Sequence, residues 1–219
     1  PAGLLMHPLG VSWLSTPEAS LAEPEPNLAG LLLRNRPGIS RAGVRRCGIV
    51  HRLDRQTSGV LLVAKTQRAY EALIRGFKMR DISKIYRAVV RGAWAEGRAS
   101  VLVPVGRKPG HRQVIATPFG KEASTAFTVV ASCPGGTLVE ALPKTGRTHQ
   151  IRVHLNLLGH PVMGDLEFDR PGPQDLRPPR LMLHAYRVGL DHPVSGRPVS
   201  YAVRIPRDMS GFWAVCRKA

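Results

Sequence analysis

The pattern of apolar and polar residues predicts more strand than helix along most of this chain. Short apolar or alternating runs typical of strands stand at residues 59–65, 84–92, 98–105, 112–117, 124–132, 137–143, 182–190 and 199–205. Most of these runs follow one another closely enough to pair antiparallel. The pattern therefore predicts an α+β fold with a mixed, mainly antiparallel sheet and flanking helices.

Helical spacing of apolar residues is found in fewer segments. It predicts helices at residues 28–35, 67–80, 148–158 and 209–217. Asn27, Thr66 and Thr148 are the expected N-caps of the first three, since short polar side chains can accept a hydrogen bond from the first turn. Gly159 is expected to close the third helix.

Three segments rich in proline, glycine or charge read as loops. Residues 15–26 and 169–180 are rich in proline and are predicted to be exposed. Residues 37–48 are predicted to form a basic loop that contains glycine.

The net charge is the feature of the composition that says most about the partner of this protein. The 219 residues include 32 Lys and Arg against 15 Asp and Glu, a formal net charge of +17. A charge of this size indicates a polyanionic partner, with nucleic acid first. Arg outnumbers Lys 25 to 7, which suits phosphate and base edges, although GC-rich coding produces the same bias.

Other composition features limit the classes of protein that remain. The three cysteines are odd in number and far apart, which fits a reducing compartment and no zinc site. No apolar run approaches ~18 residues, so no membrane span is expected, and the start lacks a signal peptide's basic region. A start at Pro1 leads us to expect a truncated or processed chain.

A first cluster of candidate chemistry lies at residues 48–59. It sets Asp54 between Arg52 and Arg55, with Thr57 close behind. Arginine and hydroxyl donors would keep a carboxylate ionised and oriented, as a nucleophile or a base requires. A salt-bridge cluster in a surface turn is the alternative, and composition alone favours it.

A second cluster lies at residues 144–154, where a strand is expected to end and a helix to begin. Amide groups at the helix N-terminus, with Arg147 and Arg152, could bind an anion, and His149 lies one helical turn from Arg152. Ordinary capping with exposed polar side chains is equally open. His149 and His154 are five residues apart, which does not suit helical metal chelation, so no metal is expected.

A third candidate is Tyr86, which would share one strand face with Lys84 and Ala88. A tyrosine among basic residues could stack on a base or accept a proton. Taken alone, a tyrosine that packs on the sheet is the more common case.

A fourth candidate is the basic segment from Arg107 to Arg112, in which Pro109-Gly110 supports a turn. It could form an arm that grips phosphates, or a solvated charged loop.

Taken together, these segments resemble the RluA family of RNA pseudouridine synthases over nearly the whole chain. The motif HRLDRQTSG is similar to the family's catalytic motif. Further similar segments follow in family order: GVLLVAKT, KIYRAVVRG, GKEASTAFTVV, TGRTHQIRVHLNLLGHPVMGD and LMLHAYRVGLDHPVSG. The opening PAGLLMHP also resembles a family segment, but the expected lysine and the strand before it are absent. We therefore expect one catalytic domain over residues 1–219, without its first strand and without an S4-type domain.

The resemblance implies roles for individual residues. Asp54 corresponds to the catalytic aspartate, and Tyr86 to the tyrosine that contacts the target base and takes part in proton transfer. Arg152 corresponds to the arginine that pairs with the catalytic carboxylate. Arg52 corresponds to a residue that enters the space left by the flipped uridine. Further RNA contacts are expected from Arg55, Thr57, Arg107, Arg112, Arg147 and His149.

The resemblance also implies the activity, an isomerase that converts specific uridines of ribosomal or transfer RNA to pseudouridine. It would act in the cytoplasm as a monomer, with a central RNA-binding cleft and with no cofactor or metal. Whether Asp54 attacks C1′ or C6, or the reaction passes through a glycal, stays open. The alternatives are a non-catalytic RNA-binding or ribosome-assembly protein on the same scaffold, and a hydrolase with an aspartate nucleophile.

Overall fold

The chain divides into two units in the computed structural model, which describes residues 1–219 except 9–13, 15, 17, 96, 108–109 and 112. Unit 1 comprises Pro1–Ile82 and Gly189–Tyr201, and unit 2 comprises Ser83–Val188 and Ala202–Ala219. The expectation of a single domain over residues 1–219 stays a prediction. No helix of the described residues is long and apolar enough to span a membrane.

Unit 2 is built on a sheet with the strand order β8-β2-β7-β6-β3. The strands are β2 (Ser83–Val90), β3 (Arg98–Leu102), β6 (Ser124–Cys133), β7 (Gly136–Pro143) and β8 (Leu183–Asp191). The pairs β2–β7, β7–β6 and β6–β3 are antiparallel. The predicted α+β class with a mainly antiparallel sheet is confirmed.

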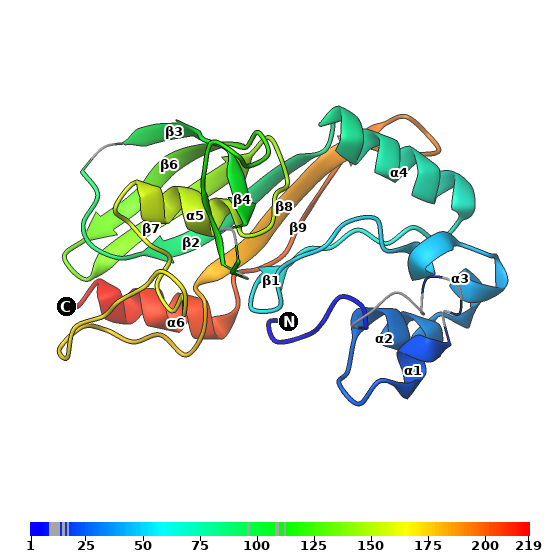
Figure 1. The fold of residues 1–219 in the computed structure, drawn as a ribbon, viewed down its shortest axis with the longest axis horizontal. Helices are drawn as coiled ribbons and strands as arrows, with labels where there is room; N and C mark the ends of the chain where they lie inside the picture. Colours follow the sequence, from blue (N-terminus) through cyan, green and yellow to red (C-terminus); the bar gives the residue numbers. More distant parts are fainter. Residues whose placement is uncertain (9–13, 15, 17, 96, 108–109, 112) are drawn as a thin grey trace. The chain divides into compact units, whose positions relative to one another are not determined.

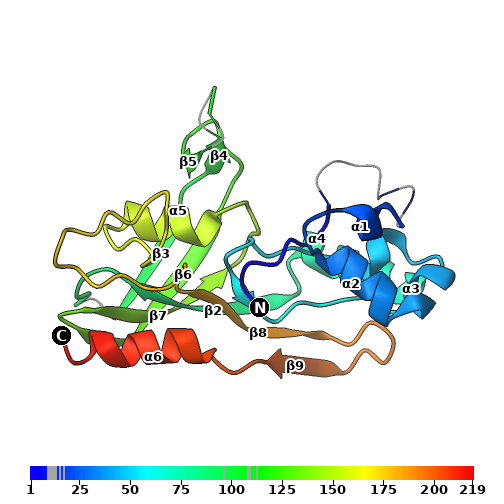
Figure 2. The ribbon, with the colours of Figure 1, turned by 90° about the horizontal axis from the view of Figure 1, so that it is seen from below.

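The core of unit 2 lies on both faces of this sheet. Ala88, Val89 and Val90 are consecutive and have no exposed surface, which requires cover on both sides because side chains alternate along a strand. Helices α5 (Gln150–Leu157) and α6 (Arg207–Cys216) supply this cover, and Figure 2 shows them on either side of the strands.

A separate pair of strands projects from unit 2. Strands β4 (Val105–Arg107) and β5 (Val114–Ala116) are antiparallel. The predicted single strand at 98–105 is wrong, since β3 ends at Leu102 and β4 begins only at Val105. The proline at position 104 explains the break, because it has no amide hydrogen for the ladder.

Unit 1 is mainly helical. Its elements within Pro1–Ile82 are α1 (Ala19–Ala22), α2 (Leu28–Asn35), α3 (Pro37–Arg41), the 3-10 helix η2 (Arg45–Gly48), β1 (Ser58–Gly59) and α4 (Gln67–Met79). The loop predicted at 37–48 is therefore wrong, and the loop predicted at 15–26 contains a short helix. These short helices lack a long apolar repeat, and instead they cover a small core that includes Ala29, Leu33 and Ile49.

The buried strand predicted at 59–65 is also wrong. Only Ser58–Gly59 is a strand, and the segment after it joins residues 48–51 through a single bridge, Ile49 to Val63. A side-chain hydrogen bond takes the place of a backbone ladder bond here, since His51 Nε2 accepts from the Leu62 amide at 2.8 Å. Figure 1 shows the two extended arms side by side in cyan.

Two of the three predicted N-caps are confirmed. Asn27 accepts from the Gly30 amide at 2.9 Å, and Thr66 accepts from the Ala69 amide at 3.2 Å. Thr148 is not a cap, since α5 begins at Gln150 after His149, whose backbone is left-handed.

The remaining predicted elements are close to those observed. Gly159 follows α5 with a φ of +81°, as expected for a residue that ends a helix. Helix α6 is confirmed, and β9 (Pro198–Ala202) pairs with β8. Residues 169–180 contain no helix or strand.

Replacing Asn27 tests the helix cap of unit 1. Asn27 is buried, and its Nδ2 also donates to the Ser20 carbonyl at 3.0 Å. We expect Asn27→Ala to lower the free energy of unfolding by about 2 kcal/mol, the upper end for caps. Asn35→Ala, which removes one exposed bond on the same helix, should cost under about 0.5 kcal/mol. Equal losses in urea unfolding would contradict the assigned cap.

Candidate active site

Asp54 lies in a tight turn in unit 1. The Thr57 amide donates to the Asp54 carbonyl at 2.8 Å, which closes the turn. Asp54 is half-buried, whereas Leu53 before it is buried and Arg52 is exposed. The alternation places the apolar Leu53 in the core and leaves Asp54 half-buried.

The two arms behind this turn are fastened to each other. The Ala64 amide donates to the Gly48 carbonyl at 2.8 Å, beside the Ile49–Val63 bridge. Gly48 has a φ of +78°, and a Cβ there would overlap the Ala64 carbonyl, so only glycine fits this close approach. The His51 ring packs against Phe77 of α4, with ring centroids 4.7 Å apart and an angle of 31° between the planes. The arms therefore form a fixed support for Asp54.

The basic and hydroxyl residues around Asp54 differ in what they contact. Arg55 donates to Glu25 at 3.2 Å and to the Gly3 carbonyl at 3.1 Å, so it ties the N-terminal segment to the turn. Arg52 is exposed and makes no hydrogen bond or ion pair within the described residues. Thr57 is buried, and its Oγ1 has no partner there either.

Tyr86 is on β2 in unit 2, opposite Ala141 of β7. It is half-buried and packs on the core. Lys84, two residues earlier on the same face, donates through Nζ to the Thr145 carbonyl at 3.3 Å, and burial lowers the pKa of this ammonium. The face thus carries an aromatic ring beside a partly desolvated cation.

Arg152 of α5 is held by a buried carboxylate. Its Nε and Nη2 donate to the two oxygens of Asp165 at 2.6 and 2.7 Å. Only 8% of Arg152 and 2% of Asp165 is exposed. Glu167 lies 3.5 Å from Arg152 Nη2 and 3.4 Å from His149 Nδ1. The bidentate pair with Asp165 fixes the plane of the Arg152 guanidinium.

A buried amide that sequence analysis missed fixes the start of α5. Gln150 Oε1 accepts from the Thr145 hydroxyl at 2.7 Å and the Arg147 amide at 2.9 Å. Its Nε2 donates to the Ser124 carbonyl and the Thr125 hydroxyl, both at 3.0 Å. A polar residue in a first helical turn usually faces solvent, so the sequence carries no signal for this role.

The segment after α5 contains two further aspartates that sequence analysis did not single out. Asp165 binds Arg152, and Asp169 binds Arg91 of unit 2 with one oxygen at 2.8 Å from Nη2. Gly164, directly before Asp165, has a φ of +81°, and a Cβ there would overlap the Arg180 carbonyl. The arginine partners of Asp165 and Asp169 lie 13 and 78 positions away in the sequence, so only the folded chain shows these pairs.

The remaining predicted contact residues lie in unit 2. Arg147 donates through Nε to the Glu122 carbonyl at 2.9 Å, and Arg107 is exposed at the end of β4. Arg112 lies outside the described residues, as does Pro109 of the predicted turn. Beyond the β4–β5 pair, Phe119 is 95% exposed, an aromatic that the sequence pattern did not reveal.

The structure groups the predicted site residues within each unit. Unit 1 contains Arg52, Asp54, Arg55 and Thr57, and unit 2 contains Tyr86, Arg107, Arg147, His149 and Arg152. The expected pair between Arg152 and Asp54 stays a prediction. Among the described residues, no group of three or more His, Cys, Asp or Glu side chains could hold a metal ion.

The amino-acid sequence was compared with those of known protein families. The family model described as RNA pseudouridylate synthase matches residues 1–157. The chain belongs to this family. The matched range includes the Asp54 turn, Tyr86 and Arg152, and it confirms the resemblance seen in the motifs.

Members of the family from bacteria are similar along nearly the whole chain. A ribosomal large subunit pseudouridine synthase D from Nitrosomonas europaea is 38% identical and covers 99% of this chain and 61% of that protein. An uncharacterized RNA pseudouridine synthase from Bacillus subtilis is 36% identical, over 100% of this chain and 68% of that one. The chain spans about three fifths of the length of several curated relatives that it matches.

Two solved human structures are also similar. RNA Pseudouridylate Synthase Domain Containing 1 has 32% identity and a TM-score of 0.67, over 82% of this chain and 74% of that one. RNA Pseudouridylate Synthase Domain Containing 4 has 20% identity and a TM-score of 0.69, over 99% and 87%. The second likeness supports the fold alone.

Replacing Gln150 tests the support of Arg152 in this family member. We expect Gln150→Leu to lower the free energy of unfolding by about 3 kcal/mol, because buried donors and acceptors lose their partners. Gln67 is likewise the first residue of a helix, but its two bonds are exposed. Gln67→Leu should therefore cost under about 1 kcal/mol. Equal unfolding midpoints for the two variants in urea would show that the buried amide is not a structural anchor.

Proposed function

We propose that this protein isomerises uridine to pseudouridine in RNA. The observation that carries the proposal is the HRLDRQTSG motif, in which Asp54 is the one carboxylate and lies in a fixed turn, within a chain of the RNA pseudouridylate synthase family. The target uridine has to leave its stack, because C1′, C5 and C6 are poorly accessible inside a helix.

The proposed reaction needs a nucleophile or base and a path for protons. The bond between N1 and C1′ breaks, the base turns, and a bond between C5 and C1′ forms. The proton on C5 leaves, and N1 gains one. We assign Asp54 to the step that opens the glycosidic bond, by attack on C1′ or C6 or by removal of the proton that gives a glycal.

Tyr86 and Arg152 would complete the site from unit 2. The half-buried Tyr86 ring offers a flat face for the base, and its hydroxyl would take part in proton transfer. Arg152 would pair with Asp54 and keep it ionised. Arg152 already binds Asp165 and lies 3.5 Å from Glu167, so its guanidinium stands in an orientation that is suited to carboxylates.

Binding of the RNA would depend strongly on charge. With a net charge of +17, we expect an affinity that falls steeply with salt and depends little on sequence. Arg55, Thr57, Arg147 and His149 remain proposed contacts, together with the β4–β5 arm. The exposed Phe119 beside that arm is suited to stack on an unpaired base.

The RNA of the large ribosomal subunit is the substrate that we propose, because several relatives are named for it. Transfer RNA is the second candidate. Action as a monomer in the cytoplasm, without cofactor or metal, remains part of the proposal. A protein that only binds RNA, or one that hydrolyses the glycosidic bond, would differ in its product.

Replacing Asp54 tests the proposed chemistry. We expect Asp54→Asn to lower pseudouridine formation by about a thousandfold or more, because an amide has a similar shape but is a poor nucleophile, while RNA binding persists. Pseudouridine would be mapped in ribosomal and transfer RNA from a deletion strain that carries either the wild-type or the variant gene. A site restored by both genes would contradict the assignment.

Replacing Arg52 tests whether it fills the space left by the uridine. A planar guanidinium could stack in the gap and offset part of the unstacking cost. We expect Arg52→Ala to lower kcat/KM on a stem-loop about tenfold or more, and to change it little on an unstructured oligonucleotide with the same uridine. Arg68→Ala, an exposed change on α4, is the control. Equal losses on both substrates would show that Arg52 has another role.

A further inference from the structure

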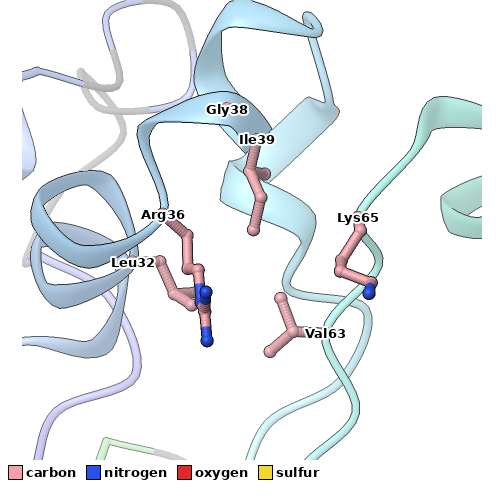
Figure 3. Close-up of a pocket in the computed structure, with 6 residues that line it drawn as sticks. All are labelled: Leu32, Arg36, Gly38, Ile39, Val63 and Lys65. Carbon is pink, nitrogen blue, oxygen red and sulfur yellow. The ribbon is translucent and has the colours of Figure 1, made fainter.

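Unit 1 contains a pocket that plays no part in the proposed chemistry. Its volume is about 380 Å³, and it is lined by Leu32, Arg36, Gly38, Ile39, Val63 and Lys65. A volume of this size is at the lower end of the range of about 300–1,000 Å³ usual for small-ligand sites. The residues come from the end of α2, the start of α3 and the segment before α4 (Figure 3).

The wall of this pocket is apolar. Leu32, Ile39 and Val63 point toward the same space (Figure 3). Ile39 is 6% exposed, while Leu32 and Val63 are half-buried. Such a surface favours burial of an apolar group, and the face of a nucleobase is one.

Two cations flank the apolar wall. Arg36 and Lys65 are both exposed, and neither side chain makes a hydrogen bond or ion pair within the part of the chain that the structure describes. Other arginines are satisfied internally, as Arg55 is by Glu25 and Arg91 by Asp169. Two unpaired cations beside an apolar pocket favour an anion that carries a flat apolar group.

We propose that this pocket binds one unpaired nucleotide of the RNA, a different nucleotide from the target uridine. Its base would lie against Leu32, Ile39 and Val63, and its phosphates would bind Arg36 and Lys65. A nucleotide joins a planar base to a phosphate within one unit, whereas an unmodified peptide needs an aromatic and an acidic side chain to offer the same pair of groups. That the nucleotide belongs to RNA rests on the proposed function.

Charge reversal with a matched control tests this pocket. The variant R36E/K65E changes the two pocket cations, and R34E/R68E changes two exposed arginines of α2 and α4 outside the lining. The net charge changes equally in both. The probe is a single-stranded oligouridylate of about ten nucleotides, whose binding is followed by fluorescence anisotropy over a range of salt concentrations.

We expect R36E/K65E to lower the affinity about tenfold more than R34E/R68E does. The slope of log K against log salt should shrink by about 1.4 relative to the control, the value for two lost phosphate contacts on a single strand. Equal losses in the two variants would overturn the proposal, since they would indicate a diffuse effect of net charge.

Filling the pocket tests the place of the base separately. Val63→Trp keeps both cations and should weaken binding of the oligouridylate by about tenfold, but leave binding to the same strand in a duplex with oligoadenylate unchanged. Its unfolding midpoint in urea shows whether the variant is folded, and a misfolded variant leaves the charge-reversal comparison to decide. Equal weakening on both probes would contradict a base in the pocket.

Two further outcomes separate this proposal from others. Polyglutamate that competes with the oligouridylate and shows the same loss in R36E/K65E would assign the pocket to an acidic protein segment and overturn the proposal. Binding needs no turnover, so selective loss in R36E/K65E would support the pocket even if the wild-type protein forms no pseudouridine. In that case the proposed function alone would fail.

Discussion

The bidentate pair between Arg152 and Asp165 is the interaction on which the candidate site in unit 2 depends. It joins α5 to the segment that follows it and is almost fully buried. Removing one partner of such a pair costs about 3–5 kcal/mol, because the other charge stays buried alone. The buried Gln150 amide fixes the same first turn of α5 to Ser124 and Thr145. The guanidinium that we assign to the chemistry therefore has one orientation before any RNA binds.

In unit 1, the backbone contacts of a turn fix the position of the half-buried Asp54. The turn at Asp54 rests on two arms that are joined by the Gly48 carbonyl and the His51 ring rather than by a regular ladder. Arg52, two residues before Asp54, is exposed and has no hydrogen-bond or ion-pair partner among the described residues. A rigid turn with an exposed cation beside the carboxylate suits the proposed entry of Arg52 into the space left by the uridine.

Local patterns predicted the elements whose stability is local. The hairpin of the strands at 124–132 and 137–143 and the caps at Asn27 and Thr66 depend on neighbours close in the chain, and the structure confirms them. The strand at 84–92 is confirmed too, although its partner is distant, since Tyr86 lies opposite Ala141. The prediction of a strand at 59–65 is wrong, because the run has a single bridge to Ile49 and its Leu62 amide donates to the His51 side chain, which no apolar pattern reports.

The candidate residues show the same division between local and distant contacts. Asp54, Tyr86 and Arg152 were singled out from charge, strand faces and the family resemblance. Gln150 and Asp165 were not, because their partners are set by tertiary contacts that no local spacing reports.

The most direct test of the account is to follow the hydrogen on C5 of uridine. Ribosomal RNA transcribed with uridine that carries tritium at C5 would be incubated with the protein. The account predicts release of tritium into water, with no free uracil and with the RNA chain intact, because C5 loses its hydrogen when it bonds to C1′. Bound RNA with no tritium release would indicate a binding protein, and free uracil would indicate a hydrolase; either result would contradict the account.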